Sequence, residues 1–240
     1  MDFNTGTGGT RDPGGSPSGP SGPPPRTSGV AAGGEFDYRD PVQSFVTTVQ
    51  RVVLQPVDFY RGLQHRGDFL NPLIFSIICY EVYALLGGLI GLVFGSVASI
   101  GPGSAGQQAA GVATSIGGFL LSIILAPIWA ALILFVMAGL RYLLVILIIG
   151  QQNAGFEATM RVQAYTFATR IIWWIPILGP LVGFVYGLYL SVVGIREVHA
   201  TTTGKAALVA LIPVVVLLLF LALLAALFGA LIWTVLQQQA

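Results

Sequence analysis

Long apolar runs separated by short polar segments fill most of the chain after residue 70. Four of these runs lie at about residues 72–100, 118–150, 177–195 and 206–236, and a fifth, more polar run lies at 156–175. A helix needs about 20 residues to cross the hydrocarbon core of a bilayer. The pattern therefore predicts an all-α, polytopic membrane protein in which residues 69–240 form a bundle of five transmembrane helices.

Residues 40–68 carry apolar side chains at helical spacing instead of a continuous run. The residues near positions i, i+3, i+4 and i+7 are Val42, Phe45, Val46, Val49, Val52 and Val53. Asp40 can cap this helix, and Pro41 suits its first turn. Because about 14 residues cannot cross a bilayer, we expect an amphipathic helix that lies either on the membrane surface or against the other cytoplasmic segments.

The N-terminal segment has a composition of its own. Glycine, proline and serine account for 20 of the first 34 residues. Such a segment has too little apolar surface to offset the entropy lost on ordering, so we predict that residues 1–39 form a disordered cytoplasmic tail. The tail contains no apolar stretch of the signal-peptide type, so we expect the first membrane helix to direct insertion.

The composition supports a membrane location. Charged residues make up 9% of the chain, against about 25% in soluble domains. So little charge cannot cover a globule of 240 residues with polar surface, so we expect the lipid bilayer to be the main partner. The net charge of +1 gives no electrostatic basis for nucleic-acid binding. Cys79 is the single cysteine and cannot form an intrachain disulfide.

The basic residues indicate how the chain is oriented. Six arginines precede the first expected span, at positions 11, 26, 39, 51, 61 and 66, whereas the loop after that span has no basic residue. Arg141 and Arg161 flank the next turn, and Arg196 and Lys205 flank the loop before the last span. With an odd number of spans, this pattern places the N-terminus in the cytoplasm and the C-terminus outside the cell membrane.

Polar residues within the expected spans predict a buried polar seam. Glu81 lies about ten residues into the first span, roughly 15 Å deep. One helical face of the third span carries Thr159, Gln163, Thr166 and Arg170. An intramembrane carboxylate needs a partner or water, so we expect Glu81 to pair with Arg170, or alternatively with Arg141. The seam is either a structural ion pair that fixes helix register or part of a solute path or lipid-headgroup site.

Small residues also recur at helical spacing. Two of the expected spans carry glycines every four residues, at Gly87, Gly91 and Gly95 and at Gly183 and Gly187. Small residues on one face let helices approach closely. We expect these faces to pack inside the monomer, with a homo-oligomer interface as the alternative.

The segment GIREVHATTTGKAAL, residues 194–208, gathers polar groups between two apolar runs. It contains Gly204-Lys205 but otherwise departs from a phosphate-binding loop. Glu197 and His199 are two residues apart and point to different faces of a helix, so they do not predict a metal site. We interpret Arg196, Glu197, His199 and Lys205 as parts of a cytoplasmic hairpin in which a threonine at 201–203 caps the last helix. No spacing matches a catalytic constellation, so we expect no enzymatic activity, cofactor or metal.

Three stretches of the chain resemble bacterial members of the Yip1-domain family. They are GDFLNPLIFSIICY entering the first span, GFEATMRVQAY opening the third, and GIREVHATTTGKAALVALIP between the fourth and fifth. The resemblance covers about residues 40–236 and implies a five-helix integral membrane protein. Eukaryotic relatives act in vesicle traffic between endoplasmic reticulum and Golgi and engage Rab-type small GTPases. They carry an Asp-Leu-x-Gly-Pro stretch where this chain has Asn71-Pro72, so the resemblance implies fold and membrane placement more than it implies a GTPase partner.

Two functions are consistent with these patterns. We expect a non-enzymatic multi-pass protein that acts as a membrane scaffold or adaptor and meets a protein partner at its cytoplasmic face. The alternative is a small transporter or channel for ions or lipids that uses the polar seam around Glu81 and Arg170. The two hypotheses differ in whether the cytoplasmic segments or the interior of the bundle carry the function.

Overall fold

The computed structural model describes residues 34–98, 105–151 and 153–238, and every regular element in these ranges is a helix. The elements are α1 (Pro41–Leu54), α2 (Pro56–Arg61), α3 (Leu70–Ala98), α4 (Ala105–Ile148), α5 (Phe156–Thr166), the 3-10 helix η1 (Phe167–Ile172), α6 (Leu178–Val198) and α7 (Thr203–Gln238). Most of the expected N-terminal tail lies outside the described residues. The all-α fold class is confirmed.

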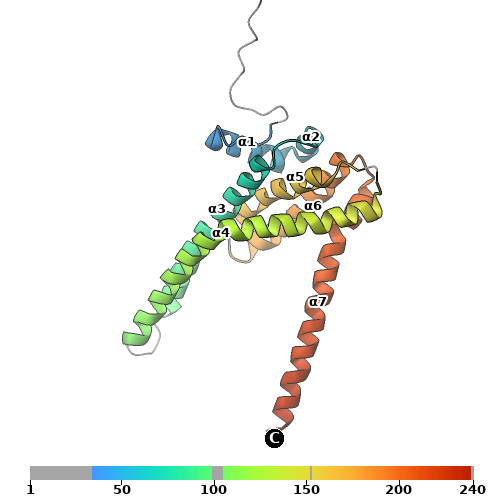
Figure 1. The fold of residues 1–240 in the computed structure, drawn as a ribbon. Helices are drawn as coiled ribbons and strands as arrows, with labels where there is room; N and C mark the ends of the chain where they lie inside the picture. The colour runs from blue at the N-terminus through green and yellow to red at the C-terminus, as the bar shows by residue number, and fades with distance from the viewer. Residues whose placement is uncertain (1–33, 99–104, 152, 239–240) are drawn as a thin grey trace, which may run out of the picture.

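The helices form one layered body with two long extensions (Figure 1). In this view α1 and α2 lie above a layer that contains α5, α6 and the C-terminal part of α4. The N-terminal part of α4 extends away from this layer beside α3, and α7 extends from its other side. α4 therefore changes direction along its length. Pro127 lies inside this helix, and an internal proline removes a backbone hydrogen bond and permits a bend.

Within the described ranges, four helices are long and apolar enough to cross a membrane. They contain the segments Leu70–Gly95, Gln107–Ile148, Leu178–Val198 and Thr203–Gly229. These segments coincide with the first, second, fourth and fifth expected spans. The prediction of a polytopic membrane protein is therefore confirmed, but the described part of the chain holds four such spans and not five.

The expected third span is instead a short segment inside the protein. α5 has 11 residues and continues directly into the six residues of η1. All residues from 158 to 169 are buried. Polar side chains are costly in lipid, and this position keeps those of α5 away from it. The segment runs antiparallel to α6, because Ile172 lies against Gly179 at one end and Ala154 bonds to His199 at the other.

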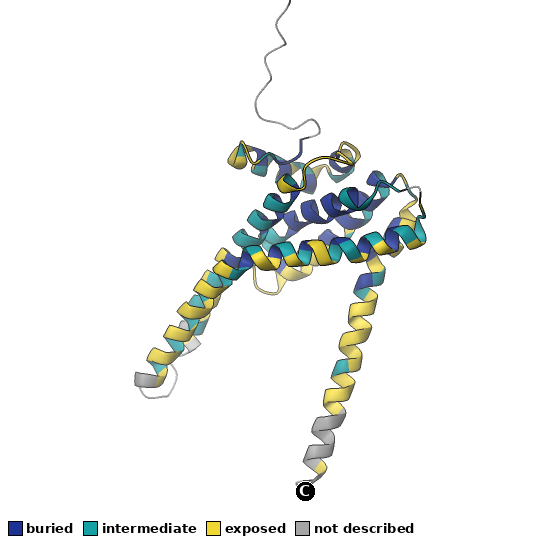
Figure 2. Cartoon of the chain, viewed as in Figure 1, coloured by how far each residue is buried: buried dark blue, intermediate teal, exposed yellow. Residues whose placement is uncertain are grey.

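The core surrounds α5, where buried residues concentrate (Figure 2, dark blue). Its largest aromatic side chains are Phe36, Phe59, Tyr60, Phe75 and Tyr165, all fully buried. The Tyr165 ring centroid lies 5.0 Å from that of Phe59 and 5.1 Å from that of Phe75. Such aromatic pairs contribute about 0.5–1.5 kcal/mol each beyond the area they bury. The start of the described chain, α2 and α3 therefore all meet on α5.

The α7 extension exposes apolar side chains around its circumference, whereas α3 and α4 pack on each other and expose the apolar side chains of their outer faces (Figure 2, yellow). On α7, the last buried described residue is Pro213, and large hydrophobic side chains are exposed from Val215 to Phe228. A helix that is apolar all round is stable only in hydrocarbon or among other apolar helices. The extensions are therefore the parts of the molecule most clearly suited to a bilayer.

The connection between α6 and α7 combines two helix-end motifs. The Thr201 amide donates to the Arg196 carbonyl at 3.0 Å and the Ala200 amide donates to the Glu197 carbonyl at 3.4 Å, which is the Schellman pattern. Ala200 has a φ of 47°, in the left-handed region. The hydroxyl of Thr202 then accepts from the Lys205 amide at 3.4 Å. A threonine therefore caps α7, as the sequence predicted.

Replacing Ala200 by glycine should stabilise the protein by about 1 kcal/mol, because glycine adopts a positive φ without the steric cost that alanine incurs. The measurement is the thermal unfolding midpoint in detergent micelles. Ala207→Gly, inside α7, is the control and should lower the midpoint, since glycine weakens a helix interior by about 1 kcal/mol. A midpoint for Ala200→Gly that is no higher than that of the parent would show that the cap is not strained.

Candidate functional site

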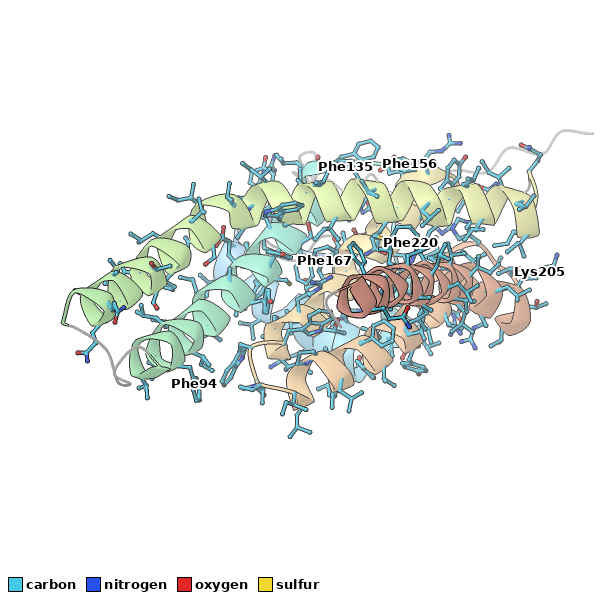
Figure 3. All side chains as sticks on the ribbon, turned by 90° about the horizontal axis from the view of Figure 1, so that it is seen from below. Phe94, Phe135, Phe156, Phe167, Lys205 and Phe220 are labelled. Atoms are coloured by element: carbon cyan, nitrogen blue, oxygen red, sulfur yellow. The ribbon has the colours of Figure 1, made fainter. Side chains whose placement is uncertain are left out.

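A cavity of about 340 Å³ lies among α4, α5, η1, α6 and α7, and we call it the Arg141 cavity. Its polar lining consists of Arg141, Gln163, Thr166, Thr169 and Arg170. Its apolar lining includes Ile133, Met137, Phe167, Phe184, Leu188, Val214 and Leu217. Figure 3 shows Phe167 of this lining between α4 and α7. Four of the six residues of the expected polar seam, all but Glu81 and Thr159, therefore line one cavity.

Several polar atoms around the Arg141 cavity have no hydrogen-bond partner in the part of the chain that the structure describes. Arg141 is only 8% exposed, and its Nε and Nη1 atoms are buried without a hydrogen-bond partner among the described residues. The same holds for Gln163 Oε1 and Trp173 Nε1, whose residues also line the cavity. A buried polar group left unpaired costs about 1–3 kcal/mol, and a charged one costs more. The cavity thus presents both donors and an acceptor to whatever occupies it.

The expected ion pair between Glu81 and Arg170 is wrong. The Arg170 guanidinium carbon lies 4.1 Å from the ring centroid of Trp173 and 5.6 Å from that of Tyr80. Ring faces attract a cation electrostatically, so aromatic side chains surround this charge in place of a carboxylate. Glu81 is half-buried on α3 and forms no ion pair within the part of the chain that the structure describes.

Thr159 lies apart from the cavity and binds the loop after α6. The Ala154 amide donates to His199 Nδ1 at 3.1 Å, so the neutral imidazole carries its proton on Nε2, which lies 3.1 Å from Thr159 Oγ1. The Thr159 hydroxyl donates in turn to the Gly155 carbonyl at 3.1 Å. Both contacts of the ring suit its neutral form, and burial lowers the pKa of the His199 imidazole to about 4.

The other polar residues of this loop tie α6 to α2. Glu197 accepts from Arg61 Nε at 3.1 Å and from Arg196 Nη2 at 2.6 Å. Lys205 is exposed at the start of α7. The end of α6 therefore contacts α2 through Glu197, and the loop after it contacts α5 through His199, which is the arrangement of a packing element.

A buried polar cluster that the sequence did not lead us to expect joins the N-terminal segment to α5. Arg161 Nη1 lies 2.5 Å from Glu35 Oε2, and each side chain is only 4% exposed. Glu35 also accepts from the Tyr165 hydroxyl at 3.0 Å and from the Gln64 amide at 2.8 Å. Arg161 Nη2 donates to the Asp68 carbonyl at 2.8 Å. One network thus holds together α5, the start of the described chain and the segment before α3.

Only part of this network had a signal in the sequence. Glu157 and Arg161 are four residues apart on a helix and also form an ion pair, at 3.2 Å. Glu35 is 126 residues away from Arg161 in the chain, and no local spacing connects them. Because Glu35 and Phe36 are buried, the folded domain begins earlier than the boundary at residue 39 that the composition indicated.

The glycines of the two spaced sets lie in different surroundings. A Cβ at Gly183 would collide with the side chain of Trp173, directly after η1, and a Cβ at Gly187 would come within 3.2 Å of Thr169 in η1. The missing side chains therefore let this segment pack against α6. At Gly95 a Cβ would come within 2.6 Å of α4. The nearest such atom to Gly87 is at 3.6 Å, and Gly91 has no described neighbour within 4 Å. Close approach inside the monomer therefore accounts for three of the five positions.

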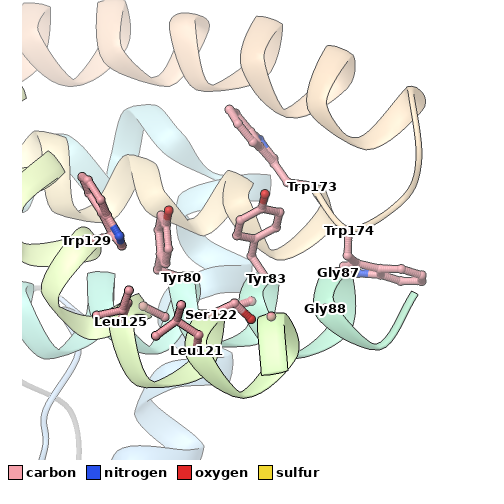
Figure 4. Close-up of a pocket in the computed structure, with 13 residues that line it drawn as sticks. Tyr80, Tyr83, Gly87, Gly88, Leu121, Ser122, Leu125, Trp129, Trp173 and Trp174 are labelled. Carbon is pink, nitrogen blue, oxygen red and sulfur yellow. The ribbon is translucent and has the colours of Figure 1, made fainter. Parts of the chain in front are cut away.

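A second cavity, of about 570 Å³, lies between α3 and α4 beside the turn after η1 (Figure 4). Its aromatic lining consists of Tyr80, Tyr83, Trp129, Trp173 and Trp174. None of the residues that line it is charged. This lining suits apolar contents, and it leaves the Arg141 cavity as the charged site of the two.

The Glu35–Arg161 pair should behave as a buried ion pair in a double-mutant cycle. Glu35→Met or Arg161→Met alone should destabilise the protein by about 3–5 kcal/mol, because each leaves one buried charge without its main partner. The double variant should cost much less than the sum. Unfolding in detergent micelles measures these values, and Arg61→Met, at an exposed ion pair, should cost no more than about 1 kcal/mol. Additive single effects would show that the two side chains are not coupled.

The buried imidazole of His199 should make stability depend on pH. Its pKa is lowered to about 4 in the fold from 6.5, so unfolding takes up a proton between these values. The contribution is complete above about pH 6.5 and is lost as the pH falls towards 4, amounting to about 2 kcal/mol by pH 5. The difference in unfolding free energy between the parent and His199→Asn, which cannot titrate, should therefore shrink from pH 7 to pH 5. A difference that stays constant would place the imidazole in an exposed environment.

Comparison with protein families identifies the chain. A family model, the Yip1 domain, matches residues 51–225, which include α2 to α6 and most of α7. Comparison with curated proteins and with solved structures found no match. The family match covers all of the core elements after α1, the Arg141 cavity and the α6–α7 loop. The chain belongs to the Yip1-domain family.

Proposed function

We propose that this membrane protein is a non-enzymatic scaffold or adaptor that recruits a protein partner at its cytoplasmic face. The observation that carries the proposal is the apolar surface of α1. Val42 and Val46, one helical turn apart, are 76% and 49% exposed, and Leu54 at the end of the helix is 74% exposed. Apolar side chains grouped on the surface outside the spans favour contact with another molecule.

The opposite side of α1 holds this surface in place. Ser44, Thr48 and Val52 are buried at intervals of four residues, and the Ser44 hydroxyl donates to the Asp37 carbonyl at 2.9 Å. The Glu35–Arg161 pair fixes the chain just before this point. A surface mounted on a fixed base loses little conformational entropy when a partner binds, which supports a role in recruitment.

The proposal includes an orientation in the membrane. Arg39, Arg51, Arg61 and Arg66 lie in or beside α1 and α2, and the positive-inside rule favours the cytoplasm for them. Figure 1 has α1 and α2 at one end of the molecule and the C-terminal end of α7 at the other. The arginines support a cytoplasmic N-terminal layer. The outer C-terminus was predicted from an odd number of spans, and the four candidate spans of the described chain do not supply that number.

Affinity purification of the full chain from native membranes into lipid nanodiscs, followed by mass spectrometry, tests the adaptor proposal. We expect a protein partner in stoichiometric amount with the parent chain. Val42→Ser with Val46→Ser should reduce its recovery at least about tenfold, because the variant loses the apolar contact. Gln43→Ser, on the same exposed helix, is the matched control and should retain the partner.

Two results would count against the adaptor role. One is the absence of any stoichiometric protein from well-folded preparations. The other is a partner whose recovery is the same with the α1 double variant, which would place its contact elsewhere. Deleting residues 1–33 in a parallel preparation separates a contact made by the N-terminal segment from one made by α1.

The Arg141 cavity favours a second candidate, a small transporter or channel for ions or lipids. It lies among four α-helices and the 3-10 helix η1, and it contains two arginines whose charges no described carboxylate in its lining balances. Such a function requires flux across liposomes that contain the purified protein, and Arg141→Gln should reduce that flux. A folded preparation without flux would contradict the transporter function and leave the adaptor role as the proposed function.

A further inference from the structure

We propose that the Arg141 cavity binds the headgroup of an anionic phospholipid, with the phosphate on Arg141 and Arg170 and the acyl chains directed out between α6 and α7. This lipid site goes beyond the proposed adaptor role and does not depend on it. The juxtaposition that carries it is a buried guanidinium, with Nε and Nη1 unpaired among the described residues, at the base of a cavity whose mouth is apolar and exposed.

The charge of the cavity requires an anion. Arg141 and Arg170 both line it, and the described lining contains no aspartate or glutamate. Arg141 is more than nine-tenths buried, with Nε and Nη1 unpaired within the described chain. An isolated buried charge is costly, whereas a paired and hydrogen-bonded one is tolerated. Phosphate oxygens accept two parallel hydrogen bonds from a guanidinium, so a phosphate matches Arg141 in charge and in geometry.

The uncharged groups around the cavity indicate what the phosphate carries. Trp173 Nε1 offers one more donor for a phosphate oxygen, while Gln163 Oε1 is an acceptor without a described partner. The hydroxyls of Thr166 and Thr169 already donate to backbone carbonyls, at 2.7 Å and 3.0 Å, so towards a ligand they can only accept. These acceptors suit a hydroxyl-bearing headgroup such as glycerol. A choline headgroup would bring a third positive charge beside two arginines.

The shape of the cavity distinguishes a lipid from a free anion. Its polar base is buried, whereas Phe184 and Leu217 at its apolar side are 46% and 55% exposed. Phe184 lies on α6 and Leu217 on α7, both within candidate membrane spans. A volume of about 340 Å³ is at the lower end of ligand cavities, which hold about 300–1,000 Å³. The headgroup therefore fits inside, and the chains lie along the exposed apolar side chains.

Binding of short-chain lipids to the full-length protein in neutral detergent tests the site. The probes are dioctanoyl phosphatidylglycerol, dioctanoyl phosphatidylcholine and inorganic phosphate, followed by native mass spectrometry and by the shift in thermal midpoint. We expect phosphatidylglycerol to bind at least about tenfold more tightly than phosphatidylcholine. Arg141→Gln should weaken that binding at least about tenfold, because it removes a charge-assisted pair of hydrogen bonds. Arg66→Gln, which removes an exposed charge outside the cavity, should not weaken it.

A variant at the mouth of the cavity keeps the test independent of the buried charge. Leu217→Trp should obstruct the exit of the acyl chains and weaken phosphatidylglycerol binding at least about tenfold. Leu218→Trp, at the neighbouring residue that is exposed and does not line the cavity, is the matched control. This pair remains informative if Arg141→Gln does not fold.

Three results would overturn the lipid site. Equal binding of phosphatidylcholine would remove the charge argument, and equal loss of binding with Arg66→Gln or Leu218→Trp would show a general surface effect. Inorganic phosphate that raises the thermal midpoint as much as phosphatidylglycerol, at the same concentration, would assign the cavity to a free anion and exclude the lipid.

Discussion

A polar helix buried in an otherwise apolar protein imposes the main constraint on this fold. α5 has no face towards lipid or water, and its buried residues include Thr159, Arg161 and Gln163. Each polar group on it must be satisfied by another part of the protein or by a bound molecule. The N-terminal segment, the segment before α3 and the α6–α7 loop all contribute groups that meet this requirement. The elements around α5 are therefore arranged by its polar side chains as much as by apolar packing.

The three buried or half-buried arginines of this region are accommodated in three different ways. Arg161 lies between two carboxylates, those of Glu35 and Glu157. Arg170 is surrounded by aromatic rings. Arg141 faces a cavity and has unpaired atoms. Arg161 also has one buried nitrogen, Nε, without a partner among the described residues, but its charge is paired with carboxylates. No carboxylate lines the cavity that Arg141 faces, and for this reason Arg141 directs attention to a ligand.

The molecule consists of a packed layer and of apolar extensions, and the two parts differ in burial. The layer holds nearly all of the buried residues. In contrast, most residues of α7 beyond Pro213 and of the far part of the α3–α4 pair are exposed or half-buried (Figure 2). The extensions fit a bilayer because hydrocarbon solvates them on all sides. The layer carries the features that distinguish this chain from any other set of apolar helices, namely the anchored α1, the α6–α7 loop and the Arg141 cavity. Both the proposed adaptor role and the proposed lipid site belong to this layer.

Local sequence pattern determined much of this architecture. Apolar runs of sufficient length predicted the four spans, helical spacing predicted α1, and a threonine before α7 predicted its cap, because each of these properties depends on residues close together in the chain. The seam residues Gln163, Thr166 and Arg170 were grouped correctly for the same reason, since they share one helical segment. Tertiary structure alone decided that this segment is buried, that Arg170 meets rings and not Glu81, and that Glu35 pairs with Arg161 across 126 residues. These outcomes depend on which distant elements pack together, and periodicity along one helix carries no information about its neighbours.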